Sequence, residues 1–190
     1  MRTRAIAAAV VAAVALVAAG CGGSDGPAAT ADVPFDRAFI DAMVPHHQQA
    51  IEMAREAKAA GLSEPALVKV ADAIIATQQG EIDELTGWRG EWFGSSEIDP
   101  AGAEALGMPM EEMGMSSAMD FSKEADVDAA FASAMIEHHN GAIAMATLAK
   151  ERAQREEIRA LAGDIIAAQE AEVAVMRPFA AGHSMAGMDG

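Results

Sequence analysis

The sequence has little of several residues that would define its class. Its 190 residues include one cysteine and no tyrosine. A single cysteine excludes an intramolecular disulfide framework. Lysine and arginine together number 13, against 29 aspartates and glutamates, which gives a formal charge of −16. Nucleic-acid binding is not expected of so acidic a chain. The acidity is equally compatible with attraction of cations and with plain solubility.

The first twenty residues resemble a leader that is removed on export. Arg2 and Arg4 precede an alanine-rich apolar run that is too short for a convincing permanent membrane span. Small residues then stand directly before Cys21, as in a bacterial lipobox, although a plain secretory signal with a chance cysteine is the alternative. We therefore predict a lipoprotein signal peptide over 1–20, lipidation at Cys21 and a flexible tether over 21–34. Loss of the two arginines would change the formal charge from −16 to −18.

An internal repeat follows. The segment "FIDAMVPHHQQAIEMA" from Phe39 aligns without a gap with "FASAMIEHHNGAIAMA" from Phe131, and nine of the sixteen positions are identical. Further along each copy, "IIATQQGEI" from Ile74 matches "IIAAQEAEV" from Ile165. A repeat of this length indicates one supersecondary unit present twice.

Each copy predicts a helical hairpin. In the first copy we expect helices over 35–60 and 64–93, with Ser63 as the N-cap of the second helix. Pro45 has no counterpart in the second copy and is expected to kink or begin the first helix, so the two copies need not bind identically.

Two hairpins, with almost no strand-forming runs, predict an all-α four-helix bundle, because neither hairpin could bury its apolar face alone. The domain is expected over 35–183, with hairpins over 35–94 and 127–183. The crossover between them, 95–126, is long enough to be functional or mobile. A methionine- and glycine-containing tail covers 184–190.

Four of the five histidines lie in the two repeated pairs. At 100° per residue, His46 and His138 fall at the centre of an apolar stripe, and His47 and His139 fall at its edge. Methionines flank each inner histidine on the same stripe: Met43 and Met53 in the first copy, Met135 and Met145 in the second.

The second helix of each hairpin places a carboxylate on its apolar face. On the helical wheel Glu81 and Glu172 lie at the centre of this face, which also includes Trp88 in the first copy and Phe179 in the second. Gln78 and Gln169 lie at its edge. Buried charge is costly unless it is paired or bound to a metal. The residues leave two interpretations open: His–Glu hydrogen bonds that fix the helix register, or a metal site built from facing helices.

The ligand types favour copper if a metal binds. The Glu-x-x-His spacing of di-iron bundles is absent around both pairs. Methionine thioethers favour copper(I), and imidazole suits copper in either oxidation state, although methionine at helical spacing is also common core filler. Short methionine and histidine clusters outside the core predict a secondary copper site, with flexible surface methionines as the alternative: Met108, Met110, Met113, Met115, His183, Met185 and Met188.

These motifs resemble domain-of-unknown-function family 305. The family pattern is an aromatic residue, Met-x-x-His-His-x-x-Ala-Ile-x-Met-Ala, and then Gln-x-x-Glu-Ile with a later aromatic residue. The chain carries it twice, from Phe39 and from Phe131, with departures at Gly141, Val173 and Phe179. The resemblance covers about 35–183 and implies a ferritin-like helical domain of exported bacterial proteins. Some members are similar to exported copper-binding proteins of the CopM type.

The leading hypothesis is an envelope-anchored protein that sequesters copper, confers tolerance or passes copper on. It would be exported and held by lipid at the outer face of the cell membrane or in the periplasm, without covalent catalysis. The expected partners are a metal ion, copper or another transition metal, and the membrane; homo-oligomerisation stays open. Two alternatives remain: a metal-dependent oxidoreductase of the ferritin-like type, and a structural or partner-binding module without metal.

Overall fold

The computed structural model describes residues 33–115 and 120–180, so the predicted leader, Cys21 and the tail lie outside the described residues. The described residues are helical and contain no strand, which confirms the all-α class. None of the helices among them is long and apolar enough to span a bilayer. The elements are α1 (Phe35–Ala60), α2 (Pro65–Phe93), α3 (Gly102–Leu106), η1 (Phe121–Lys123), α4 (Val127–Arg152), α5 (Glu156–Met176) and η2 (Arg177–Phe179).

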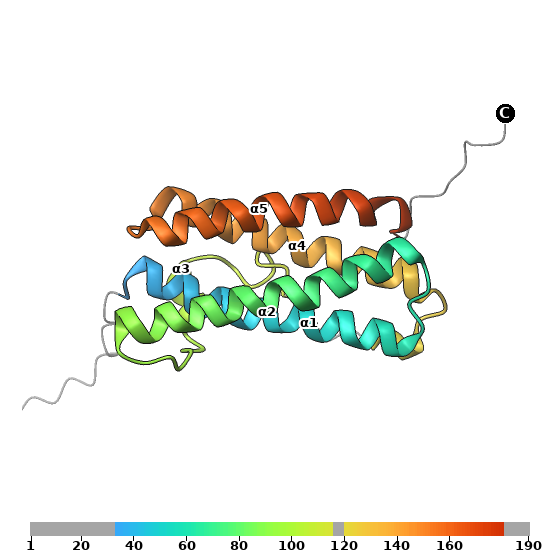
Figure 1. Ribbon diagram of the computed structural model, residues 1–190, viewed down its shortest axis with the longest axis horizontal. Coiled ribbons are helices and arrows are strands. Elements are labelled where there is room, and N and C mark those ends of the chain that lie inside the picture. Colours follow the sequence, from blue (N-terminus) through green and yellow to red (C-terminus); the bar gives the residue numbers. More distant parts are fainter. Residues whose placement is uncertain (1–32, 116–119, 181–190) are drawn as a thin grey trace, which may run out of the picture. The chain divides into compact units, whose positions relative to one another are not determined.

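The four long helices lie alongside one another (Figure 1). α1 packs against α2 and α4 packs against α5, as expected for two hairpins, and α1 also packs against α4 in the opposite direction. Apolar side chains from the two halves merge in two core clusters. One cluster contains Met43 and Met145, and the other contains Met53 and Met135. Each cluster therefore takes one flanking methionine from α1 and one from α4.

Each half caps a helix of the other half. The Asp36 carboxylate accepts hydrogen bonds from the main-chain N–H groups of Gln154 and Arg155, at 2.9 and 3.0 Å, where α5 begins. The equivalent residue of the second copy, Asp128, accepts from the N–H groups of Ser63 and Glu64, at 2.8 and 3.1 Å, where α2 begins. These N–H groups lack partners within their own helix. The duplicated halves thus depend on each other for their helix starts.

Two local expectations of the sequence are corrected. The predicted helices over 35–60 and 64–93 are confirmed to within one residue, but Ser63 is not the N-cap. Glu64 holds that position without a side-chain bond, and the Ser63 hydroxyl donates to Asp128 instead. Pro45 does not begin the first helix, because α1 is continuous through it.

The crossover packs against the core. Leu106, Met113 and Phe121 are almost completely buried, the first two in the cluster that contains Met43. Gly102 of α3 lies so close to α1 that a Cβ atom there would stand 2.1 Å from the Cβ of Asp41. The described part of the crossover is therefore a third partner of the two hairpins.

We predict that Asp36→Ala and Asp128→Ala each lower the free energy of unfolding by about 1–2 kcal/mol, because each leaves two helix-start N–H groups unpaired. Urea unfolding followed by circular dichroism measures the change. Asp83→Ala is the control, since Asp83 is exposed on α2 and, within residues 33–115 and 120–180, accepts a hydrogen bond from Gln79, its neighbour one turn away. Losses no larger than that of the control would contradict the capping role.

Candidate metal centre

The four paired histidines meet at the contact between α1 and α4. All four side chains are buried. The rings of His46 and His138 lie close together and are tilted, with centroids 3.8 Å apart and planes inclined by 37°. The outer rings lie farther away: His47 is 6.3 Å from His46, and His139 is 6.5 Å from His138. Two segments 92 residues apart in the sequence thus form one continuous row of imidazoles.

Three of the four imidazoles contact an oxygen through Nε2. His46 Nε2 lies 2.8 Å from the main-chain carbonyl oxygen of Met113. His139 Nε2 is hydrogen-bonded to Glu172 Oε2 at 2.7 Å. His47 Nε2 lies 2.8 Å from Glu81 Oε2, without the alignment of a hydrogen bond. In three of the rings, therefore, Nε2 contacts an oxygen and Nδ1 takes no part in that contact.

The Nδ1 atoms have no such partners. All four, on His46, His47, His138 and His139, are buried and lack a hydrogen-bond partner among the described residues. His138 Nε2 also lacks one. Buried polar atoms are nearly always paired, so a group of unpaired nitrogens in one row needs an explanation. Ligation of a metal ion is one function that uses such nitrogen atoms.

The glutamines and glutamates exchange their predicted places. Gln78 and Gln169 are 2% and 3% exposed, whereas the Glu81 and Glu172 side chains are 19% and 16% exposed. The prediction that the glutamates occupy the core centre is therefore wrong. They lie at the rim and contact the outer histidines. The Oε1 atoms of Gln78 and Gln169 are buried without a hydrogen-bond partner in the described residues.

The aromatic residues explain this error. The helical wheel of α2 used Trp88 as a core residue, but Trp88 is only partly buried. The buried residues of α2 run through Ile74, Gln78, Ile82 and Leu85, which is a regular helical stripe that leaves Glu81 at its edge. In α5 the corresponding aromatic, Phe179, lies beyond the α-helix in η2.

The flanking methionines are all buried. Met43, Met135 and Met145 are inaccessible to solvent and Met53 is 8% exposed. In the crossover, Met113 is buried and contacts His46 through its main chain, whereas Met110 is 53% exposed. Met108 and Met115 are partly buried against the core. The remaining secondary candidates, His183, Met185 and Met188, lie outside the described residues.

Burial keeps the inner imidazoles neutral. Burial, together with the neighbouring His139 and His47, lowers the pKa of His138 to about 3. Burial also lowers the pKa of His46 well below its ordinary value, with His138 and His47 contributing in the same direction. A neutral imidazole carries a free lone pair, which is the form that binds metal.

The donor set fits a soft metal better than a hard one. No group of three or more His, Cys, Asp or Glu side chains in the described ranges is arranged to hold a metal ion. The inner pair supplies two imidazoles, and further donors would have to come from methionine, glutamine or the outer histidines. Imidazole with thioether is a combination that selects copper(I).

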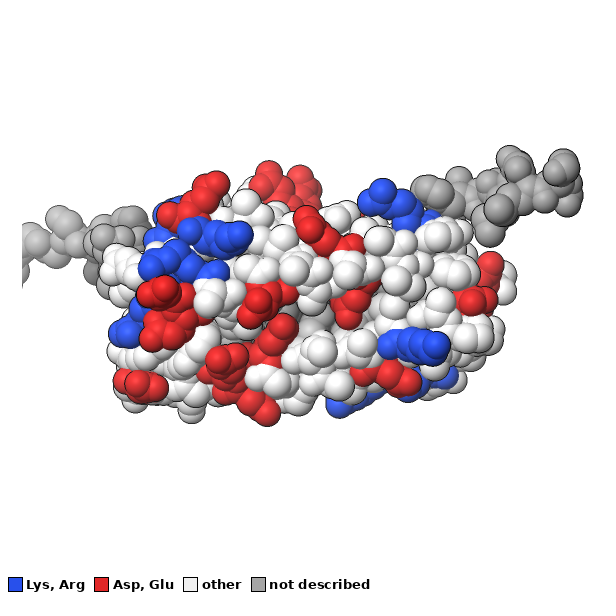
Figure 2. All heavy atoms as spheres, turned by 45° about the horizontal axis from the view of Figure 1, so that its top comes forward, with Lys and Arg blue, Asp and Glu red and all other residues white. Residues whose placement is uncertain are grey.

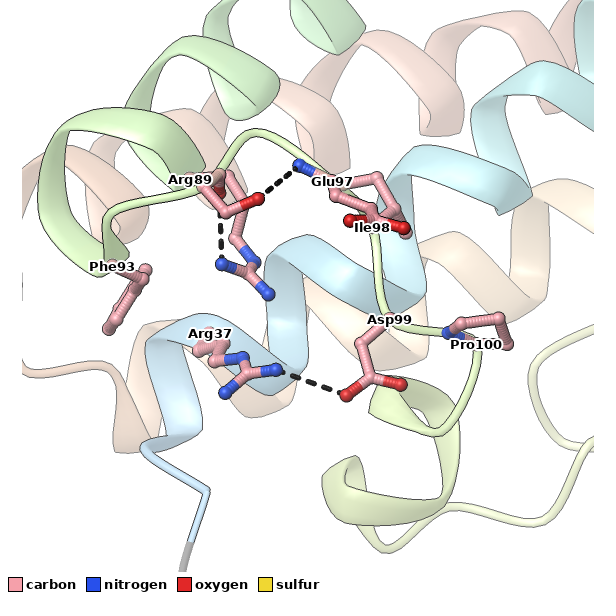
Figure 3. Close-up of a pocket in the computed structure, with 8 residues that line it drawn as sticks. Arg37, Arg89, Phe93, Glu97, Ile98, Asp99 and Pro100 are labelled. Atoms are coloured by element: carbon pink, nitrogen blue, oxygen red, sulfur yellow. Dashed lines mark hydrogen bonds and ion pairs between the residues drawn. The ribbon is translucent and has the colours of Figure 1, made fainter.

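Two hollows lie elsewhere on the described surface. The first hollow, lined by Arg37, Arg89 and Asp99 among others, is drawn in Figure 3. There Arg37 points to Asp99, and Arg89 donates a hydrogen bond to the main-chain carbonyl of Ser95 at the start of the crossover. Both arginines also bond the buried Asp41 carboxylate, so their charges are already paired. The other hollow is an apolar groove between α2 and α5, lined by Val70, Ala73 and Glu172, among others. Glu172, which lines this groove, also bonds His139.

The chain belongs to the family described as domain of unknown function DUF305, whose model matches residues 36–180. This confirms the resemblance seen in the two repeated motifs. No curated protein matches the chain.

Solved structures of the family are similar to this fold. CopM in its Cu(I)-bound form is 33% identical, with a TM-score of 0.62, and the match covers 76% of this chain and 94% of that one. CopM structures with Cu(II) and with silver bound match equally well. A DUF305 protein of Streptomyces coelicolor, described as secreted, is 25% identical with a TM-score of 0.65, covering 75% of this chain and 90% of that one.

We predict that the folded chain loses stability as the pH falls below about 6.5. The pKa of His138 is about 3 in the folded state and near 6.5 when unfolded, so the unfolded chain binds more protons between these values. Each such histidine lowers the free energy of unfolding by roughly 1 kcal/mol per pH unit. Urea unfolding between pH 7.5 and pH 5 measures the slope. The slope should shrink in the His46→Leu/His138→Leu variant, and an equal slope would contradict the neutral burial of these rings.

Proposed function

We propose that this protein binds copper outside the cytoplasm and sequesters it or passes it on. The observation that carries this proposal is the set of four buried Nδ1 atoms without hydrogen-bond partners, in a row of histidines contributed by both halves. A metal ion would satisfy these lone pairs, which apolar packing leaves unsatisfied.

Copper(I) is the ion that the surroundings support best. Thioethers from four buried methionines lie in the apolar clusters on either side of the histidines, and they are soft donors. The inner pair supplies two neutral imidazoles, which suit copper in either oxidation state. The similarity to CopM, whose solved forms include Cu(I)-, Cu(II)- and silver-bound states, supports the same ion class.

Different residues of the chain would have different roles in binding the metal. His46 and His138 would hold the ion, with His47, His139 and the flanking methionines as additional ligands. Glu81 and Glu172 would orient the outer rings, as carboxylates do beside many metal-bound histidines. The crossover and tail methionines would form a weaker capture site. We propose a ferritin-like four-helix bundle as the scaffold and a lipid on Cys21 as the anchor.

The surface charge is consistent with cation capture. In the view of Figure 2, acidic side chains are spread over the whole visible face, and lysines and arginines gather toward its two ends. A negative surface raises the local concentration of cations, although this effect does not choose among metals.

A purely structural role is the second candidate, and the outer pairs favour it. The His139–Glu172 bond and the His47–Glu81 contact could fix the register of α4 on α5 and of α1 on α2. This role leaves the inner pair unexplained, because neither glutamate contacts His46 or His138. It predicts that added copper(I) or silver(I) does not raise the melting temperature.

We predict that the chain binds copper(I) and that changing His46, His47, His138 and His139 to alanine abolishes high-affinity binding, because the buried nitrogen donors are gone. Competition titration with a chromophoric copper(I) chelator gives the stoichiometry and affinity. The matched control replaces Met108, Met110, Met113 and Met115 with leucine, which removes the crossover thioethers and leaves the histidines.

The control variant should keep the high-affinity site and lose only weak binding. Thermal unfolding of each variant shows whether it is folded under the titration conditions. Unchanged stoichiometry and affinity in the variant that lacks the four histidines would contradict the core-site proposal.

A further inference from the structure

The crossover reaches the histidine row through its main chain, not through a thioether. The carbonyl oxygen of Met113 lies 2.8 Å from His46 Nε2. A carbonyl oxygen can only accept a hydrogen bond, so Nε2 must carry the proton. The His46 ring is fully buried, and its Nδ1 has no partner among the residues that the structure describes. In the neutral ring, Nδ1 therefore presents a lone pair.

Two glycines allow the crossover to come this close. A Cβ atom on Gly141 of α4 would stand 2.0 Å from the Met113 carbonyl oxygen, and any other residue would push the crossover away. Gly114 has φ of +66°, and a Cβ atom there would stand 2.6 Å from the carbonyl oxygen of Glu137. The chain at 113–114 thus lies directly on the backbone of α4, beside His138.

The repeat shows that this contact belongs to one half only. Gly141 aligns with Gln49 of the first copy, so of these two aligned positions only the one in α4 lacks a side chain and lets the crossover approach the helix. His138, the partner of His46, has no well-aligned hydrogen bond at either ring nitrogen within the described residues, although an interaction with the main chain of His46 raises its pKa. The two inner histidines are therefore held differently, although their motifs are repeats of each other.

We infer that the main-chain carbonyl of Met113 is a positioning group, which holds His46 in the tautomer protonated at Nε2 and so assigns Nδ1 as its metal-binding atom. Gly141 is the residue that makes this contact sterically possible. The inference rests on the proposed function for its metal, but the tautomer belongs to the metal-free protein. A fixed ring and a fixed tautomer make a histidine a better ligand, because less reorientation is needed on binding.

The test uses the chain labelled with ¹⁵N-histidine, with and without silver(I) as a stable substitute for copper(I). In the metal-free protein, long-range ¹H–¹⁵N spectra should show His46 protonated at Nε2. On addition of silver(I), the His46 Nδ1 resonance should shift while Nε2 keeps its proton. A His46 protonated at Nδ1, or one that binds silver through Nε2, would overturn the inference.

Two variants separate the carbonyl from other effects. Gly141→Ala should mix the His46 tautomers and weaken copper(I) binding by about 10- to 100-fold. Its matched control is Gly163→Ala in α5, where an added Cβ atom meets nothing within 4 Å, so tautomer and affinity should be unchanged. Met113→Leu keeps the carbonyl and removes the sulfur, so the His46 tautomer and the high-affinity binding of copper(I) should be those of the wild type.

The outcomes distinguish the inference from the proposed function. A wild-type tautomer and affinity in Gly141→Ala would refute the positioning role. If Met113→Leu binds copper(I) more weakly with an unchanged His46 tautomer, Met113 acts through its thioether. That result would also refute the positioning role of its carbonyl. If the wild-type chain takes up no copper(I), the proposed function fails, and the spectra of the metal-free chain still decide the tautomer.

Discussion

The rest of the structure has to accommodate one contact, the close approach of His46 and His138 inside an apolar core. Two neutral imidazoles lie there with ring centroids 3.8 Å apart, and three of their four ring nitrogens lack a hydrogen-bond partner in the described part of the chain. Such a contact costs stability in the metal-free protein, because buried nitrogens lose water and gain nothing in return. The surrounding fold has to supply the stability that this centre lacks.

Contacts between the two halves of the duplicated fold supply this stability. Methionines of α1 and α4 pack in pairs on both sides of the histidines, and Asp36 and Asp128 each cap a helix of the opposite half. Burial raises the pKa of Asp128, but the N–H groups of Ser63 and Glu64 lower it by more, so the cap keeps its charge at neutral pH. Because the caps and the histidine row both need two halves, neither hairpin can form the centre alone.

Periodicity predicted the helices and the central position of His46 and His138, because both are local properties of an amphipathic helix. It failed for Glu81 and Glu172, because Trp88 and Phe179 were assigned to a core stripe that they do not share. It could not find the hydrogen bond from Ser63 to Asp128, which lies 65 residues away, nor the contact of His46 with the Met113 carbonyl, which lies 67 residues away. Contacts at such separations depend on the path of the crossover, and no sequence period records that path. Gly141 was the one local signal, since it departs from the repeat where the crossover meets α4.

The central claim is that buried imidazole nitrogens hold the metal. X-ray absorption at the copper edge of the copper(I)-loaded chain tests it most directly, because imidazole rings give a multiple-scattering pattern that thioethers and carboxylates do not. The account predicts at least two imidazole ligands at each tightly bound copper, with sulfur as an added scatterer from methionine. A first shell of sulfur alone, with no imidazole pattern, would place the copper on the methionine segments and contradict the account.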